Sequence, residues 1–277
     1  MNDFNTNALP ALSRAKLKLL GSLVYKKYRQ RERKFVAEGV RLLEEALSTG
    51  VCIDWAVLEA GQRQPSDREL NLLDRLLREK VPVFRCEAKS LGKALDTVQP
   101  QTLAGVCSLG QEVRLGNVVV PEHCLLVLCD RLSEPGNLGA VIRAAASWGA
   151  YLVLTTPGTA DPWSPKCVRA SAGALFRLPV VEAEQSAPLL EKFFQEHGFT
   201  VFEAAALGRD VFAIEGFPAR TAVVLGSEAG GVGSSFARLA GSKISVPMAR
   251  GVESLNVAVA AGVILYEIGR KRLKGGE

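Results

Sequence analysis

The chain has 277 residues, of which 48% are hydrophobic and 23% are charged, and it carries a net charge of +5. This composition is typical of a globular protein with one large or two medium domains, and it argues against disorder. No apolar run approaches the roughly 18 residues of a membrane span, and the N-terminal segment lacks the apolar core of a signal peptide. We therefore expect a cytoplasmic protein that does not associate with a membrane.

Positive charge is concentrated near the N-terminus, where the pattern predicts a helix over about residues 11–30. Residues 14–34 contain nine basic side chains and a single acidic one. The basic residues are Arg14, Lys16, Lys18, Lys26, Lys27, Arg29, Arg31, Arg33 and Lys34. Such density attracts polyanions because their phosphates release counterions on binding. We predict an RNA contact in this region, and a solvated helix face is the alternative.

The remainder of residues 1–108 alternates strands with helices. Short strands are expected in KFVAEG, VCIDWAVL, VPVFRC and TLAGVCSL. A helix is expected after Ser66, because Glu69 follows three residues later and completes a capping box. This alternation predicts a small α/β domain over residues 1–108. Residues 109–122 lack helical periodicity and contain glycine and proline, so we predict a linker there.

Residues 123–277 are expected to form a second α/β domain. Apolar, β-rich runs occur in LLVLCD, YLVLTT, FRLPVVE, FTVFEAA, TAVVLGSE and KISVPM, and helices are expected to start near Asn137, Ser164, Ser186 and Gly233. Near-continuous apolar strands are typical of a parallel sheet that is covered on both faces. Ligands of such sheets bind at the loops beyond the carboxyl ends of the strands.

Two of these loops are rich in glycine and polar residues. In CDRLSEPGNLGAVIRAAASWGA, Arg143 offers fixed donors suited to phosphate or carboxylate, although a surface salt bridge is the alternative. In VVLGSEAGGVGSS, the glycines can present backbone groups to a ligand, although a plain tight loop is the alternative. This second loop has neither the GK[ST] of a phosphate-binding loop nor the spacing of a dinucleotide GxGxxG.

The third loop lies in MARGVESLNVAVAAGVILYEIGRKR. Ser254 is expected to be the N-cap of a buried helix that starts at Leu255, and basic residues follow at the carboxyl end of that helix. Capping is sufficient to explain Ser254. It explains Asn256 less well, because an amide in a buried first turn needs a hydrogen-bond partner.

The six cysteines show no CxxC pair, and most of them lie in apolar strand-like runs. We predict that they are reduced and packed in the core. The two histidines have no partner in the sequence that indicates a metal or a triad. No metal site is expected.

Three segments, in this order, resemble the motifs of the SpoU (TrmH) family of RNA 2′-O-ribose methyltransferases, in the SPOUT superfamily. They are EPGNLGAVIRAAASWGA, VVLGSEAGGV and ISVPMARGVESLNVAVAAGVILYE. The resemblance covers the whole second domain, and the first domain resembles the substrate-binding domain often placed ahead of it. It implies a parallel α/β sheet with a deep trefoil knot that binds S-adenosylmethionine.

The resemblance also implies roles for single residues. The cofactor is expected at the backbone of Gly226, Val246 and Leu255, with Met248 helping to close the pocket. The polar positions around the reacting ribose correspond to Asn137, Arg143, Glu228, Ser254 and Asn256. A guanidinium is effectively always protonated, so we assign Arg143 to the target phosphate and to developing negative charge rather than to a general base.

Further expectations concern partners and substrate. Arg169, in WSPKCVRASAGALFRLP, is assigned either to RNA phosphate or to packing under the site. Family members are typically homodimers. Because ribosomal-RNA members often carry a separate N-terminal domain, large-subunit ribosomal RNA is favoured over transfer RNA. The other hypotheses are a non-catalytic RNA-binding assembly factor and a nicotinamide-dependent oxidoreductase, against which the missing GxGxxG argues.

Overall fold

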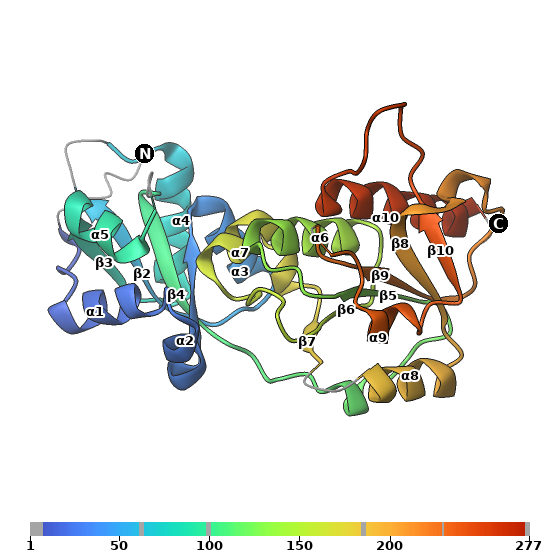
Figure 1. Ribbon diagram of the computed structural model, residues 1–277. Helices are drawn as coiled ribbons and strands as arrows, with labels where there is room; N and C mark the ends of the chain where they lie inside the picture. The colour runs from blue at the N-terminus through green and yellow to red at the C-terminus, as the bar shows by residue number, and fades with distance from the viewer. Residues whose placement is uncertain (1–7, 61–63, 98–100, 184–186, 229, 275–277) are drawn as a thin grey trace. The chain divides into compact units, whose positions relative to one another are not determined.

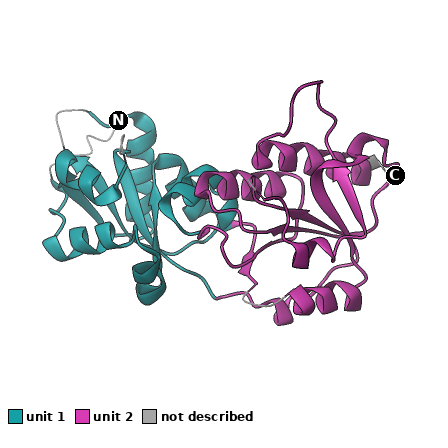
Figure 2. Ribbon diagram, in the orientation of Figure 1, with its two compact units in different colours: residues 1–111, 163–176 teal, residues 112–162, 177–277 magenta. Residues whose placement is uncertain are grey.

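The computed structural model describes residues 8–60, 64–97, 101–183, 187–228 and 230–274. The chain forms two compact units, the first from residues 1–111 and 163–176 and the second from residues 112–162 and 177–277 (Figure 2). Segment 163–176 thus belongs to the first unit although it follows part of the second in sequence. The rings of Trp163 and Phe176 pack 4.7 and 5.7 Å from the ring of Phe35, and a contiguous division of the chain does not capture this packing.

The first unit contains a four-stranded mixed sheet in the order β1-β4-β2-β3. Its strands are β1 (Lys34–Glu38), β2 (Ile53–Ala60), β3 (Val83–Glu87) and β4 (Leu103–Ser108). Helices α1 (Arg14–Ser22) and α5 (Ala88–Leu95) cover one face, and α3 (Val40–Ser48) and α4 (Asp67–Arg78) cover the other (Figure 1). This arrangement confirms the smaller N-terminal α/β domain. The expected capping box at Ser66 and Glu69 is also present.

The single helix expected over residues 11–30 is wrong, because α1 is followed by a separate helix α2 (Lys26–Glu32). Between them Leu23 turns inward and is fully buried. The guanidinium of Arg29 is also buried and donates hydrogen bonds of 2.6 Å to the carbonyls of Leu23 and Val24. These bonds satisfy the carbonyls at the break between the two helices. The break could not be predicted from the sequence, because the turn itself contains no glycine or proline.

The second unit contains a six-stranded sheet in the order β10-β8-β9-β5-β6-β7, in which every neighbouring pair is parallel. Its strands are β5 (Cys124–Cys129), β6 (Leu152–Thr155), β7 (Val180–Glu182), β8 (Thr200–Asp210), β9 (Arg220–Leu225) and β10 (Ser242–Ser245). Every residue of β5 is buried, since the sheet is covered on both faces. The parallel sheet expected from the apolar runs is confirmed.

Helices cover both faces of the second sheet. Helices α6 (Pro135–Ser147) and α10 (Val257–Lys274) lie on one face, and α8 (Ala187–Glu196) and α9 (Ser234–Ala237) lie on the other (Figure 1). The remaining elements are α7 (Pro165–Ser171), which belongs to the first unit, and the short 3-10 turns η2 (Leu115–Asn117), η3 (Ala174–Phe176) and η4 (Val211–Ala213). The helix start expected near Ser186 lies outside the described residues.

The last helix differs from its prediction in two respects. It begins at Val257 rather than Leu255. It is also not buried all round, since Val259, Tyr266 and Leu273 are 53%, 43% and 76% exposed. Within the described residues, no helix combines the length and the apolar character that crossing a membrane requires.

Candidate active site

The loop after β9 begins with a position that only glycine can occupy. A Cβ atom added to Gly226 would lie 2.1 Å from the carbonyl carbon of Gly231, which is far inside any van der Waals contact. The loop is closed by reciprocal backbone hydrogen bonds between Ser227 and Gly231, of 3.1 and 2.8 Å. Gly231 itself has a φ of +58°, in the left-handed region. The second glycine-rich segment is therefore a tight loop that requires glycine at position 226.

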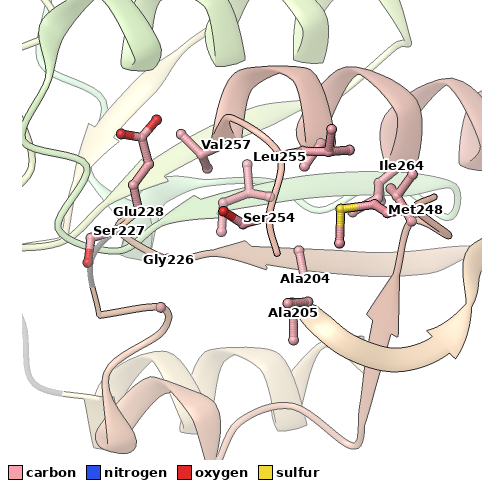
Figure 3. Close-up of a pocket in the computed structure, with 15 residues that line it drawn as sticks. Ala204, Ala205, Gly226, Ser227, Glu228, Met248, Ser254, Leu255, Val257 and Ile264 are labelled. Carbon is pink, nitrogen blue, oxygen red and sulfur yellow. The ribbon is translucent and has the colours of Figure 1, made fainter. Parts of the chain in front are cut away.

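A cavity of about 260 Å³ lies beside this loop. All four residues expected to bind cofactor line it: Gly226, Val246, Met248 and Leu255. In Figure 3, Met248 and Ile264 stand on one side of the cavity and Ser227 and Glu228 on the other, with Ser254 between them. The loops at the carboxyl ends of β9 and β10 thus meet at one pocket, as expected for a parallel sheet.

Three of the predicted polar residues form a hydrogen-bonded cluster. Oε1 of Glu228 accepts hydrogen bonds from the side-chain amides of Asn137 at 2.8 Å and Asn256 at 2.7 Å. Nδ2 of Asn256 also lies 3.1 Å from Oδ1 of Asn137. Residues from α6, from the β9 loop and from the start of α10 are therefore joined around one carboxylate. Hydrogen bonds to a charged group are stronger than neutral ones, so this cluster ties the three segments together.

The N-cap of α10 is Asn256 and not Ser254, which corrects the expectation from the sequence. Oδ1 of Asn256 accepts hydrogen bonds from the backbone N–H groups of Ala258 at 2.9 Å and Val259 at 3.4 Å. Asn256 is exposed, so its amide is not in a buried turn, and both ends of its side chain have partners. Ser254 is exposed at the wall of the pocket, and capping no longer explains it.

Arg143 lies on α6 with an exposed side chain, and it does not line the cavity. Among the described residues, none forms a hydrogen bond or ion pair with its guanidinium. The alternative of a surface salt bridge thus has no support in this part of the chain. The structure does not bring Arg143 into contact with the cluster of Asn137, Glu228 and Asn256.

A buried carboxylate, which the sequence reasoning missed, anchors the glycine-rich loop. Oδ2 of Asp130, at the end of β5, accepts a hydrogen bond of 2.7 Å from the backbone N–H of Gly233. Its Oδ1 accepts one of 2.7 Å from the hydroxyl of Thr156, and Arg131 lies 3.3 Å from Oδ2. An acid at the carboxyl end of a buried strand, next to the expected ligand loops, was the available signal.

Other residues of the pocket were also missed. The walls include Ala204, Ala205 and Ala206 in the middle of β8, and Val257, Ala260 and Ile264 on α10. Ala204 and Ala205 end the strand FTVFEAA that the sequence predicts, so the rule that ligands bind at strand ends points to them, although β8 itself continues to Asp210. The α10 side chains have no such signal, since their apolar pattern is the same as that of core residues.

The basic residues of the first unit fall into two groups. Arg14, Lys18, Lys26, Lys27, Arg31 and Arg33 are exposed. The others have internal partners: Lys34 forms an ion pair with Asp54, Nζ of Lys16 lies 5.2 Å from the centroid of the Trp55 ring, and Arg29 holds the carbonyls described above. The first group is exposed, although Arg31 also pairs with Glu32 and Arg33 donates a hydrogen bond of 2.6 Å to the carbonyl of Gly110.

Arg169 has a structural partner within the same unit. Its Nη1 lies 2.7 Å from Oε2 of Glu38, whose side chain is only 3% exposed. A buried carboxylate without a cation is costly, so this pair stabilises the packing of α7 against β1. Of the two roles expected for Arg169, the geometry favours packing.

The family follows from a comparison with known proteins. Residues 124–266 match the model of the SpoU rRNA Methylase family, and residues 14–105 match the MRM3-like substrate binding domain. The chain belongs to the SpoU methylase family. The resemblance noted in its three motifs is thereby confirmed, and the nicotinamide alternative loses its basis.

Three relatives illustrate the likeness of this SpoU methylase. It is 33% identical to the 23S rRNA (uridine(2479)-2′-O)-methyltransferase of Streptomyces viridochromogenes, over 89% of this chain and 86% of the relative. It is 30% identical to the 23S rRNA (guanosine(2553)-2′-O)-methyltransferase RlmP of Bacillus subtilis, over 88% and 91%. The solved SpoU methyltransferase AviRb from Streptomyces viridochromogenes, in complex with AdoMet, has a TM-score of 0.79 and 28% identity, covering 94% of this chain and 99% of that one.

The pocket fits the S-adenosylmethionine of the SpoU methylases. Its walls are mostly apolar, from Ala204 through Leu225 to Ile264, which suits a nucleoside ring system. Backbone groups of the Gly226 loop and polar side chains of Ser227 and Ser254 remain for the ribose and the charged tail. Its volume of about 260 Å³ lies near the lower end of the range of about 300–1,000 Å³ that is typical of small-molecule sites.

Proposed function

We propose that this protein transfers a methyl group from S-adenosylmethionine to a ribose 2′-hydroxyl of large-subunit ribosomal RNA, in the cytoplasm. The observation that carries the proposal is the junction between the cofactor-type pocket and the Asn137, Glu228 and Asn256 cluster, because Glu228 belongs to both. The named relatives support ribosomal RNA and the ribose 2′-oxygen as the target.

S-adenosylmethionine, when bound, supplies an electrophilic methyl group. The protein's own residues have to place the ribose hydroxyl in line with it and to stabilise the charge that develops as the hydroxyl loses its proton. Ser254, exposed at the pocket wall, is proposed to hydrogen-bond the hydroxyl. Asn137 and Asn256 are proposed to orient the ribose from a position that Glu228 fixes.

Arg143 is proposed to hold the target phosphate and to stabilise negative charge on the ribose oxygen. Its guanidinium is a permanent cation with several donors, suited to a phosphate rather than to accepting a proton. Its exposed position on α6 leaves it accessible to RNA. If Arg143 acts on the transition state, its removal lowers the rate of methyl transfer and leaves cofactor binding unchanged.

The test is methyl transfer from labelled S-adenosylmethionine to transcripts of large-subunit ribosomal RNA and of transfer RNA. We expect label in the ribosomal RNA, recovered after digestion as a 2′-O-methylated nucleoside. Label on a base would contradict the chemistry. Label in transfer RNA alone would support the second substrate hypothesis instead.

A non-catalytic role in ribosome assembly is the other candidate, supported by the exposed cations of the first unit. Growth or subunit assembly in cells that carry only the Arg143→Ala protein separates the two. If methyl transfer is the function, the Arg143→Ala protein should fail to restore growth or subunit assembly. Full rescue by a variant that does not methylate would favour the assembly factor.

The proposed RNA surface of the first unit comprises Arg14, Lys18, Lys26, Lys27, Arg31 and Arg33. Their exposure supports contact with phosphates, which attract Lys and Arg largely by counterion release. Arg29, Lys34, Lys16 and Arg169 are left out of this surface, because the partners described above occupy them.

A homodimer is proposed through α10. Val259, Tyr266 and Leu273 recur every seven residues and are exposed, so they form an apolar stripe along one side of the helix. Such a stripe is costly in water and suits a second copy of the same helix. Sedimentation of Val259→Glu should show a monomer where the native protein is a dimer. A native protein that sediments as a monomer would contradict the proposal.

The trefoil knot remains a proposal as well. It is supported by the segment from Val246 to Asn256, which lies against the loop after β9 and bonds to Glu228. A crystal structure in which the C-terminal segment passes through a loop formed by an earlier part of the chain would establish the knot. An unthreaded C-terminal segment would exclude it.

A further inference from the structure

Tyr25 stands in the turn between α1 and α2 with 62% of its side chain exposed. The other exposed aromatic side chains of the described residues, Tyr151, Phe212 and Tyr266, are between 42% and 49% exposed. A large ring in water is costly unless a partner covers it. Its surroundings indicate which kind of partner that is.

The ring of Tyr25 lies against a second aromatic ring, which two cations contact in turn. Its ring lies 6.4 Å from that of Tyr28 at an angle of 66°, an edge-to-face pair. Tyr28 itself is contacted by cations, since Nζ of Lys27 and the guanidinium of Arg31 each lie 4.9 Å from its centroid. Tyr28 is thus a support, whereas Tyr25 is the ring that faces solvent.

The turn that presents Tyr25 is fixed in place. The buried guanidinium of Arg29 holds the carbonyls of Leu23 and Val24, and the backbone N–H of Tyr25 donates a hydrogen bond of 3.0 Å to the carbonyl of Ser22. A ring presented by a rigid turn loses little conformational entropy when it binds. Arg29 is therefore buried, although it lies in the middle of a basic helix, because it stabilises the turn that carries Tyr25.

We propose that Tyr25 is a stacking platform for an unpaired base of the RNA substrate, with Lys27 and Arg31 beside it for the adjoining phosphates. The inference rests on the proposed function and names the kind of RNA that this unit selects. Single-stranded nucleotides are recognised by stacking on aromatic rings flanked by positive charge, and a base inside a duplex has no free face to offer. The unit is therefore built for loops or bulges rather than for continuous duplex.

The test uses the full-length protein and two synthetic RNAs of equal length. One is a hairpin whose loop carries a single 2-aminopurine, and the other is a fully paired duplex. Tyr25→Ala should bind the hairpin roughly 5- to 150-fold more weakly, the range for loss of one stacked base, and should no longer quench the 2-aminopurine fluorescence. Duplex binding should change little. Tyr25→Phe should keep both hairpin affinity and quenching.

Controls separate stacking from charge and from folding. Tyr151→Ala removes an exposed tyrosine of the other unit and should bind both RNAs like the native protein. Lys27→Ala should lower the salt dependence of binding by about one phosphate contact, whereas Tyr25→Ala should leave that dependence unchanged. Tyr25→Leu keeps apolar area without a π face and should behave like Tyr25→Ala.

The outcomes also separate this inference from the proposed function. Hairpin binding and quenching by Tyr25→Ala equal to the native protein would overturn the stacking role, even if the native protein methylates ribosomal RNA. Failure of the native protein to methylate any ribose would overturn the proposed function, and the hairpin measurements would still decide the role of Tyr25. Equal binding of hairpin and duplex by the native protein would also exclude selection of unpaired bases.

Discussion

The side chain of Asn256 joins the start of α10 to Glu228: its amide nitrogen donates a 2.7 Å hydrogen bond to Oε1 of Glu228, while its oxygen caps the helix. Asn256 therefore has two roles, helix capping and the hydrogen bond to Glu228, and a substitution can separate them. Asn256→Asp keeps the capping oxygen but places a second carboxylate against Glu228. Like charges at that distance repel, so the Glu228 side chain should no longer be held in its present position.

For Asn256→Asp we expect methyl transfer to fall about ten-fold or more, since a hydrogen bond to a charged group contributes roughly 1.5–3 kcal/mol, with the thermal midpoint near that of the native protein. Asn256→Ala should lose activity and also about 1 kcal/mol of stability, the usual contribution of an N-cap. Rate measurements and thermal unfolding of both variants check this. Full activity in Asn256→Asp would mean that the bond to Glu228 is not needed.

Asp130 is expected to position the cofactor loop. Asp130→Asn has one acceptor oxygen in place of two, so the N–H of Gly233 and the hydroxyl of Thr156 cannot both keep their present acceptor. An unsatisfied buried group costs about 1–3 kcal/mol, so S-adenosylmethionine should bind about ten-fold more weakly by calorimetry. Asp74→Asn, at a surface ion pair with Arg78, is the matched control and should bind normally. Unchanged affinity in Asp130→Asn would exclude the positioning role.

Glu267 should make stability depend on acid pH. Hydrogen bonds from Arg270, and then from Lys271, lower the pKa of this carboxyl from 4.5 to about 2. A carboxyl whose pKa is depressed on folding stabilises the protein fully above its ordinary pKa, and that contribution is lost as the pH falls from about 4.5 to about 2. Urea unfolding of the native protein and Glu267→Gln should therefore differ at pH 6 and converge toward pH 2. A difference that is constant across this range would contradict the assignment.

Thiol reactivity should single out Cys52. The predicted packing of the cysteines in the core is correct for five of the six, which are buried, and wrong for Cys52, which is exposed. Burial raises the pKa of the Cys124 thiol to about 11 and raises that of Cys107 further, and a protonated thiol is a poor nucleophile. At pH 8 a thiol reagent should modify one residue of the folded protein rapidly, and that reaction should vanish in Cys52→Ser. Rapid modification of a second thiol, located by mass spectrometry, would contradict the packing.

The exposed and the engaged cations should behave differently. Lys18→Ala should weaken RNA binding and reduce its dependence on salt concentration by about one phosphate contact, without affecting stability. Lys34→Ala should instead lower the free energy of unfolding, because it leaves Asp54 without its ion-pair partner. Filter binding across a salt series, together with urea unfolding, distinguishes the two. Equal effects of both variants on RNA binding would show that the division of the basic residues is wrong.

The sequence by itself determined the strands, the parallel sheet and the place of the pocket. Continuous apolar runs such as LLVLC occur only where a strand is buried on both faces, and polar or glycine-rich residues after those runs mark the edge where ligands bind. The resemblance to the SpoU motifs pointed to Gly226, whereas its close approach to Gly231, beside which no side chain fits, is seen only in the structure. The motifs then connected these loops with one family.

Only the tertiary structure decided which side chains are free and which are engaged. Local pattern shows that Arg29, Lys34 and Arg169 are cations, but not that Arg29 turns back to the carbonyls of Leu23 and Val24. It also does not show that Lys34 and Arg169 pair with Asp54 and Glu38, which are distant in sequence. The cap of α10 was misplaced because Ser254 and Asn256 are both good N-cap residues, and the choice depends on partners far away in sequence, Asn137 and Glu228. Such partners are brought together by folding, and no local propensity records them.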